Sequence, residues 1–313
     1  MHDLKISVII PTLNRKSDLE KTLISISKCN KKPDEIIIID QSDNSETENL
    51  CNNLKDLNLK YFHFEVKSLT LARNYWIEKL NKDSNIIQFF DDDVLLEKNY
   101  FNELERFFIN NRNAKWWVGN INNISRKITI SKKIWLFLLS WKWKQDRFFV
   151  TRWWFNAMPF NNPNFTTNVQ RTHWCGMFFS KSVFDEWFRF EEKFMKYSLM
   201  EDCFFSYWIQ EKYPDCLYYV PEIKLIHCES PASRIANRQK IYQNIIHRYY
   251  FIKKFKKSLL AYLWTMLIFS ISDFIQFKTL KIFWRYYKGL NYVIKNAENI
   301  WNENFDFNKF IFW

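Results

Sequence analysis

The amino-acid sequence predicts an α/β protein with an open, mostly parallel sheet, followed by a helical and basic appendage. Patterns typical of strands and helices alternate through the first hundred residues, as they do in parallel sheets built from βα units. From residue 231 onward the apolar spacing is helical. That region is also basic, since residues 234–313 hold 14 Lys and Arg against 4 Asp and Glu, within a net charge of +12. We therefore divide the chain into a domain over residues 1–230 and a helical region over residues 231–313.

Four strands and three connecting helices are expected in the first part of the domain. The strands are apolar runs rich in β-branched residues, as in strands covered on both faces: Leu4–Ile10, Glu35–Asp40, Leu59–Val66 and Asn85–Phe90. The helices have apolar residues at helical spacing: Lys16–Lys28, Ser45–Leu54 and Leu69–Leu80. Because such crossovers are right-handed, the carboxyl ends of the parallel strands are expected at one edge of the sheet.

The remainder of the domain has shorter and less regular patterns. Two strands are expected within residues 115–130, and others at Thr172–Ser180, Cys216–Val220 and Lys224–His227, the last two separated by Pro221. Helices are expected at Val183–Phe190 and Glu201–Lys212.

The most apolar stretch of the chain lies in the helical region, at Ser258–Ser272. Its fifteen residues are fewer than the roughly 20 that a helix needs to span a bilayer. Lysines flank the stretch on both sides, and a basic, aromatic region favours an anionic surface, either phospholipid or nucleic acid. We expect residues 234–313 to bind an anionic membrane surface peripherally. The alternative is that the stretch is a core helix packed against the first domain.

Composition excludes several common kinds of site. The chain has three glycines, Gly119, Gly176 and Gly289, so the dinucleotide fingerprint GxGxxG and the phosphate loop GxxxxGK[ST] are both absent. Its six cysteines are never closer than twelve positions, which excludes CxxC motifs for zinc or redox chemistry. The apolar run Ile6–Ile10 is too short for the core of a signal peptide. We therefore expect a cytoplasmic protein with reduced, mostly buried cysteines.

Polar residues follow three of the predicted parallel strands, at the edge of the sheet where ligands bind. The first strand runs into Pro11-Thr12-Leu13-Asn14-Arg15, the second ends in Asp40, and the fourth runs into Asp91-Asp92-Asp93. Crowded carboxylates raise one another's pKa unless a cation lies between them, and oxygen ligands suit Mg²⁺ or Mn²⁺. The sequence therefore predicts a divalent metal site at the aspartate cluster. The alternative is that these aspartates only cap the following helix.

Five motifs in order along the chain resemble the family-2 nucleotide-sugar glycosyltransferases, whose fold is called GT-A: SVIIPTLNR, EIIIIDQSDNS, LARN, FFDDDV and MED. The resemblance implies a GT-A-type open mixed sheet. Its Rossmann-like N-terminal half, residues 1–115, would bind the nucleotide-sugar, and residues 116–230 would bind the acceptor. Gln41 stands where the family often has glycine. In the segment HWCGMFFS, which resembles the acceptor side, Trp174 would stack on a sugar or belong to the core.

The resemblance also implies roles for individual residues. Those that would bind the donor come from the first four motifs: Pro11, Thr12, Asn14, Arg15, Asp40, Arg73, Asp91 and Asp92. Asp91 and Asp93 would bind the divalent cation on the diphosphate, with His227 as a further metal ligand or as a structural histidine. In the MED motif Asp202 would be the general base, with Glu201 beside it. The alternative for Asp202 is an acid that stabilises the start of a helix.

One main function and two alternatives follow. The main hypothesis is an inverting, metal-dependent glycosyltransferase that moves a sugar from a nucleotide-sugar, by default a UDP-sugar, to a hydroxyl of a glycan or lipid-linked acceptor. The reaction fits surface polysaccharide or glycoconjugate synthesis at the cytoplasmic face of a membrane, with no nucleic-acid partner. The first alternative is a basic, metal-dependent nucleic-acid-binding protein or nuclease. The second is a catalytically silent sugar-binding relative.

Overall fold

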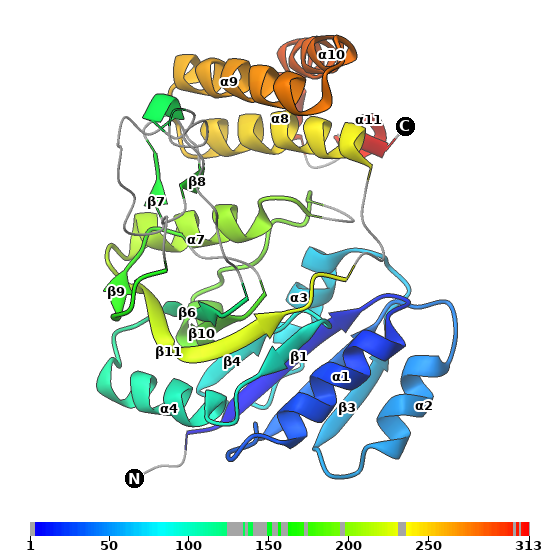
Figure 1. The fold of residues 1–313 in the computed structure, drawn as a ribbon, viewed down its shortest axis with the longest axis vertical. Helices are drawn as coiled ribbons and strands as arrows, with labels where there is room; N and C mark the ends of the chain where they lie inside the picture. The colour runs from blue at the N-terminus through cyan, green and yellow to red at the C-terminus, as the bar shows by residue number, and fades with distance from the viewer. Residues whose placement is uncertain are drawn as a thin grey trace.

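The computed structural model describes residues 4–123, 134, 137–139, 149–151, 156–157, 162–171, 175–194, 198–230, 236–302, 305–306 and 308–312. An α/β part forms one end of the molecule, and three long C-terminal helices form a layer at the other end (Figure 1). Helix α7 (Glu201–Lys212) lies between them. The predicted division into an α/β part and a helical C-terminal part is therefore visible in the architecture.

One mixed sheet organises the α/β part. Its strand order is β3-β2-β1-β4-β10-β6-β11-β5, with β9 paired to β11. The first four are parallel: β1 (Ile6–Thr12), β2 (Glu35–Asp40), β3 (Leu59–His63) and β4 (Ile86–Phe89). The others are β5 (Val94–Leu96), β6 (Trp116–Ile121), β9 (Thr167–Asn168), β10 (Met177–Ser180) and β11 (Leu217–His227). Strand β10 runs antiparallel to β4 and β6, so the open mixed sheet is confirmed. A separate pair joins β7 (Phe149–Val150) and β8 (Asn156–Ala157).

Helices cover both faces of this sheet, as the apolar strands require. On one face the core joins Ile6, Val8 and Ile10 of β1 to helices α1 (Lys16–Ser27), α2 (Glu46–Asn53) and α4 (Tyr100–Asn110). On the other face Ile9 joins α3 (Leu69–Ile77), α6 (Ser182–Asp185) and α7. Alternate residues of one strand thus supply two cores, because successive side chains point to opposite faces.

Strand β11 differs from the sequence-based expectation of two strands around Pro221. It is a single strand, and its register against β6 shifts between Val220 and Lys224. Pro221 has no N–H for a ladder hydrogen bond, so it is accommodated in this irregular stretch without ending the strand. The shift brings the backbone carbonyl oxygen of Ile223 against Gly119 of β6, where an added Cβ would lie 2.2 Å from that oxygen.

We expect Gly119→Ala to destabilise the protein by about 1–3 kcal/mol, the usual cost of overpacking a close-packed interior. The backbone at Ile223 must move to admit the methyl group. Gly289→Ala is the matched control, because its Cβ would meet the flexible end of the Ile245 side chain. Urea unfolding of both variants checks the difference, and an equal effect at the two glycines would contradict the explanation.

The C-terminal helices are α8 (Asn237–Lys254), α9 (Leu259–Phe277) and α10 (Lys281–Lys295), followed by η1 (Asn299–Trp301) and α11 (Asn308–Phe312). A third core cluster joins Phe204 of α7 to Ile245 and Tyr250 of α8. Helix α9 has 19 residues, four more than the apolar stretch identified in the sequence, because Asp273 does not end it. Of the helices in the described residues, α9 alone has the length and apolar composition needed to cross a membrane.

Candidate functional site

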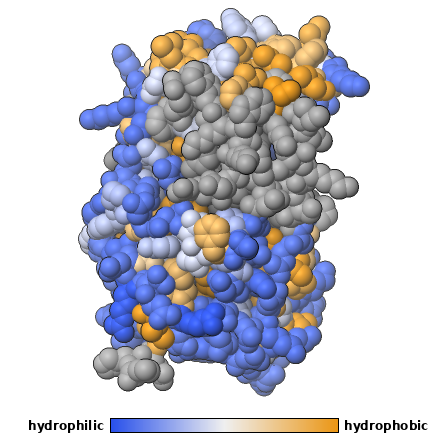
Figure 2. Space-filling model, turned by 60° about the vertical axis from the view of Figure 1, so that its left-hand side comes forward, coloured by the Kyte–Doolittle hydropathy of each residue, from blue (hydrophilic) through white to orange (hydrophobic). Residues whose placement is uncertain are grey.

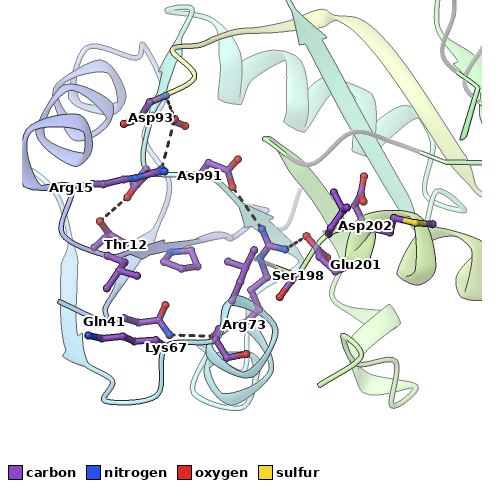
Figure 3. Close-up of a pocket in the computed structure, with 18 of the residues that line it drawn as sticks. Thr12, Arg15, Gln41, Lys67, Arg73, Asp91, Asp93, Ser198, Glu201 and Asp202 are labelled. Atoms are coloured by element: carbon purple, nitrogen blue, oxygen red, sulfur yellow. Dashed lines mark hydrogen bonds and ion pairs between the residues drawn. The ribbon is translucent and has the colours of Figure 1, made fainter. Parts of the chain in front are cut away.

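A cavity of about 560 Å³ opens where the sheet meets α7 and α8. Figure 3 shows side chains from the ends of β1 and β4, from α3 and from the start of α7 facing this space. The lining residues are Pro11, Thr12, Leu13, Arg15, Gln41, Lys67, Ser68, Leu69, Arg73, Asp91, Asp92, Asp93, Arg171, Ser198, Leu199, Met200, Glu201, Asp202, His227, Ser230, Asn244 and Arg248. Most of the predicted site residues therefore share one cavity at the carboxyl edge of the parallel strands.

Asp92 is held by the loop that follows β1. It accepts hydrogen bonds from Thr12 Oγ1 at 2.7 Å and from Arg15 Nη1 at 2.9 Å. Burial raises the pKa of Asp92 to about 6, although the positive charge of Arg15 opposes this rise. Its carboxylate therefore joins two strand ends across the sheet edge and fixes Arg15 beside the aspartate cluster.

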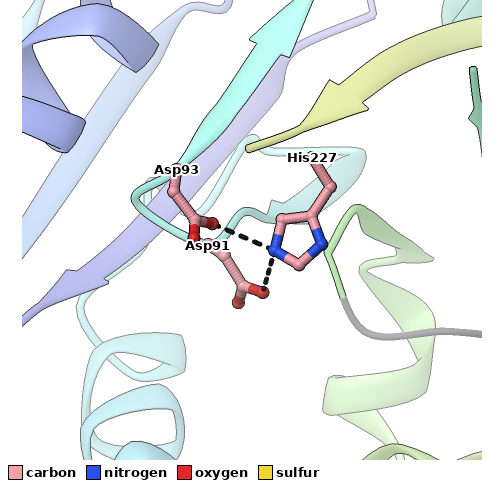
Figure 4. A group of neighbouring side chains, drawn as sticks. All are labelled: Asp91, Asp93 and His227. Carbon is pink, nitrogen blue, oxygen red and sulfur yellow. Dashed lines mark ion pairs between the residues drawn. The ribbon is translucent and has the colours of Figure 1, made fainter. Parts of the chain in front are cut away.

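Asp91, Asp93 and His227 form a compact group of possible metal ligands (Figure 4). One ligand atom from each lies within 4.8 Å of the others, and His227 Nε2 is 3.1 Å from Asp93 Oδ1 and 3.9 Å from Asp91 Oδ2. The end of β11 supplies the histidine, and the backbone N–H of Ser230 donates to Asp93 Oδ2 at 2.8 Å. Two carboxylate oxygens and an imidazole nitrogen form a donor set that fits Mn²⁺ or Mg²⁺.

Arg73 joins the aspartate cluster to the start of α7. Its guanidinium is fully buried, forms an ion pair with Glu201, and has Nη2 3.8 Å from Asp91 Oδ1. The rings of Phe89 and Phe190 lie 5.7 and 5.2 Å from its Cζ atom. A buried guanidinium of this kind keeps two carboxylates apart and fixes their orientation. Glu201 is therefore paired with Arg73 through Oε1, whereas its Oε2 has no hydrogen-bond partner among the described residues.

Asp202 differs from its neighbour Glu201 in that Arg73 forms its ion pair with Glu201. It is buried, lines the cavity, and its Oδ2 has no hydrogen-bond partner among the described residues. Burial raises the pKa of Asp202, an effect that the positive charge of Arg171 partly opposes. The backbone before it is strained, because Ser198 and Met200 have φ of 48° and 74°. This turn places a carboxylate with one unpaired oxygen in the wall of the cavity, where a proton acceptor is required.

Two predicted donor residues, Asp40 and Asn14, do not line the cavity. Asp40 is fully buried and accepts hydrogen bonds from the Tyr61 hydroxyl and the Ser42 N–H, each at 3.0 Å. Asn14 is exposed, and its N–H donates to Ser42 Oγ at 2.8 Å. Gln41, one residue after Asp40, lines the cavity, and its Nε2 donates to the Ser68 carbonyl at 3.2 Å. The roles of Asp40 and Asn14 in binding the nucleotide-sugar remain predictions. His173 and Trp174 lie outside the described residues.

Arg171, Asn244 and Arg248 are among the cavity residues that the sequence did not identify as part of a site. Arg171 follows β9 and carries no motif. Asn244 and Arg248 are separated by four positions on α8, so they share one face of the helix, and Arg248 Nε donates to Asn244 Oδ1 at 3.2 Å. Polar residues at this spacing amid the buried face of α8 are the one signal that could have identified them. Helix α8 therefore contributes to the cavity as well as to the core.

Helix α8 also holds the turn that precedes α7. His247 Nδ1 donates to the Leu199 carbonyl oxygen at 2.7 Å, and its ring stacks on Phe194 with centroids 4.1 Å apart. Burial lowers the pKa of His247 to about 4, so the ring is neutral at physiological pH. The C-terminal region thus fixes the backbone that positions Glu201 and Asp202.

Comparison with known proteins gives a family and a fold. The family model for glycosyl transferase family 2 matches residues 7–188. An uncharacterized glycosyltransferase of Rickettsia felis is 37% identical over 101 residues, which are 31% of this chain and 16% of the relative. An uncharacterized glycosyltransferase of Rickettsia conorii is 35% identical over 130 residues, 41% of this chain and 21% of the relative. The matches therefore span a small part of the length of these curated relatives.

Two solved structures share the architecture at low sequence identity. Residues 1–349 of TarS from S. aureus, in complex with UDP-GlcNAc, match 92% of this chain and 80% of their own, with a TM-score of 0.60 and 15% identity. GalNAc-T7 with UDP, GalNAc and Mn²⁺ matches 80% of this chain and 50% of its own, with a TM-score of 0.58 and 17% identity. The predicted GT-A-type fold is confirmed by this likeness.

Proposed function

The chain belongs to glycosyl transferase family 2, and from this we propose that it is an inverting, metal-dependent glycosyltransferase that uses a UDP-sugar. The observation that carries the proposal is the placement of two groups in one cavity: the ligand set Asp91, Asp93 and His227, and the unpaired carboxylate oxygen of Asp202. The bound UDP-GlcNAc of TarS and the UDP and Mn²⁺ of GalNAc-T7 support the choice of donor and cation. The acceptor is a hydroxyl of a glycan or lipid-linked sugar in surface polysaccharide or glycoconjugate synthesis.

The chemistry divides between the two ends of the cavity. Asp91, Asp93 and His227 would hold a divalent cation, which would supply positive charge for the leaving diphosphate. Arg15 and Arg73 are fixed beside that cluster by Asp92 and Glu201, where they add to the positive potential. Asp202 accepts the proton of the attacking hydroxyl, on the side of the sugar opposite the diphosphate. Attack from that side inverts the anomeric carbon.

A thermal-shift experiment tests the proposal. We expect UDP with Mn²⁺ to raise the melting temperature, because a ligand that binds only the folded state stabilises it. Single-stranded and duplex oligonucleotides with Mn²⁺ serve as the comparison, since the nuclease alternative requires them to stabilise the protein. A shift with oligonucleotides and none with UDP would overturn the proposed function.

We also propose that the enzyme works at the cytoplasmic face of a membrane and that α9 and α10 contact the bilayer. Apolar side chains gather over this end of the molecule (Figure 2). On α10 and the residue before it they recur at helical spacing, and they are exposed: Leu280 (73%), Phe283 (39%), Trp284 (57%) and Tyr287 (58%). Helix α9 adds Leu260, which is 79% exposed. An apolar face with interfacial aromatic residues is typical of helices that lie in the plane of a bilayer.

Charge and packing support a peripheral position. Exposed lysines lie around the apolar face, at Lys278, Lys281 and Lys288 among others, and each basic residue near an anionic surface contributes about 1 kcal/mol to binding. Helix α9 is packed against α8 through buried side chains that include Tyr262, whose hydroxyl donates to the Ile245 carbonyl at 3.0 Å. A helix anchored on one side to a core is suited to lie on a bilayer and not to cross it.

We expect the full chain to float with phosphatidylglycerol vesicles, and Trp284→Glu to abolish flotation. The substitution places a negative charge in the centre of the apolar face, against an anionic surface. Trp187→Glu is the matched control, because Trp187 is 79% exposed on the α/β part. Equal flotation of the two variants would contradict the assignment of the membrane face. Retention in vesicles after a high-salt and carbonate wash would mean that α9 crosses the bilayer.

A further inference from the structure

Five arginine and lysine residues line the cavity, and they differ in the groups that surround their positive charges. Arg15 and Arg73 are held by carboxylates at the aspartate cluster, and Lys67 pairs with Asp43. Arg171 and Arg248 lie toward α7 and α8. This end of the cavity is the part that the proposed donor site does not explain.

Arg171 is the more informative of the two. It is 2% exposed, it lines the cavity, and its Nε and Nη2 have no hydrogen-bond partner among the described residues. A guanidinium carries a fixed charge and five donors, and leaving such donors buried without acceptors is costly. A buried arginine of this kind therefore indicates an anionic ligand that enters the cavity.

Arg248 adds a second positive charge at the same end. It is 5% exposed, its Nε donates to Asn244 at 3.2 Å, and its Cζ lies 5.0 Å from the Phe269 ring. Burial lowers the pKa of Arg248 to about 10, and the like charge of Arg171 contributes to this lowering. Two guanidinium groups that repel each other across a cavity are stabilised when an anion lies between them.

The position of this pair relates it to the acceptor. The charge of Arg171 also acts on Asp202, which is the base in the proposed function, so the anion would bind close to the attacking hydroxyl. We propose that Arg171 and Arg248 form an anion subsite for the acceptor, and that the acceptor carries a phosphoryl group near the hydroxyl that is glycosylated. This inference rests on the proposed function and specifies its substrate class. Phosphate is favoured over carboxylate because a terminal phosphoryl group offers three acceptor oxygens and up to two negative charges to the two guanidinium groups, against two oxygens and one charge.

Calorimetric titration of the full chain, saturated with UDP and Mg²⁺, tests the subsite. The probes are glycerol 3-phosphate and glycerol, at matched ionic strength, and we expect only the phosphorylated polyol to bind. Arg171→Gln and Arg248→Gln should each weaken this binding by about tenfold or more, the scale of a lost charged hydrogen bond. Arg112→Gln is the control, because Arg112 is exposed and does not line the cavity. Circular dichroism confirms that each variant is folded.

The outcomes separate the inference from the proposed function. If the wild-type chain binds UDP with Mg²⁺ but treats glycerol 3-phosphate and glycerol alike, the anion subsite is wrong and the glycosyltransferase proposal stands. If UDP does not bind, the proposed function fails and this inference fails with it. Should both arginine variants misfold, the comparison of the two probes on the wild-type chain still decides the question.

A second pair of probes separates the two sources of a phosphoryl group. Glucose 1-phosphate presents the anomeric phosphate that a lipid carrier would supply, and methyl glucoside is its neutral partner. Preference for glucose 1-phosphate over glycerol 3-phosphate supports a lipid-linked acceptor, whereas the opposite preference supports a polyol-phosphate chain. Both preferences support the subsite when Arg171→Gln removes them, and an unchanged preference in that variant would overturn it.

Discussion

Asp93→Ala is expected to abolish metal-dependent UDP binding and to reduce transfer by about 10²-fold or more, the scale on which lost electrostatic stabilisation is measured. Asp93 is a member of the ligand set with Asp91 and His227, and it also accepts the Ser230 N–H at 2.8 Å. Its removal takes away one ligand and the partner that orients the histidine. Calorimetry with UDP, in the presence and absence of Mn²⁺, measures the binding directly.

Asp83→Ala is the matched control for this experiment. The Asp83 side chain is 71% exposed and pairs with Lys5 at the surface, so its loss removes an equal charge without touching the cavity. Asp93→Asn tests whether the carboxylate charge is needed, since the amide preserves shape. Mn²⁺-dependent UDP affinity that survives in Asp93→Ala would contradict the metal assignment.

Asp202→Asn is expected to retain UDP binding and to lose transfer by about 10²-fold or more, the usual contribution of a general base. The amide fills the same space in the cavity but cannot take the proton of the attacking hydroxyl. Steady-state rates of UDP release with an acceptor, together with the dissociation constant for UDP, separate the two effects.

Glu201→Gln is the variant to compare with Asp202→Asn, because Glu201 is the carboxylate that pairs with Arg73. Because Glu201 is bonded to Arg73 through Oε1, the glutamine variant should weaken UDP binding by disturbing Arg73 beside Asp91. The roles of the two carboxylates are reversed if Asp202→Asn transfers sugar near the wild-type rate while Glu201→Gln binds UDP normally but transfers no sugar.

The sequence was sufficient where local pattern and burial agree. The strand Glu35–Asp40 appears at the predicted bounds, because a continuous β-branched run covered on both faces has one stable arrangement. The aspartates after Phe90 were placed correctly at the sheet edge, since the carboxyl ends of parallel strands meet there. The family match over residues 7–188 confirms the predicted family and contains the first four motifs, whereas MED at residues 200–202 lies beyond it.

The sequence could not predict the direction of individual side chains or the contacts between residues far apart in the chain. Asp40 and Gln41 are neighbours, yet the first is tied to Tyr61 and the second lines the cavity, because one step along an extended chain reverses the direction of the side chain. His227 came near Asp93 only through the pairing of β11 with β5. Pattern alone does not specify such pairings.

The sequence by itself thus predicted the parallel strands, the aspartates at one edge of their sheet, and the family to which the chain belongs. The tertiary structure decided which carboxylate of the Glu201–Asp202 pair is bonded to Arg73, because Arg73 lies 128 positions from Glu201 and meets it only after folding. It also decided that α8 lines the cavity with Arg248. Packing of α8 against α7 brings that charge to the site, and a contact between two helices leaves no local pattern in either one.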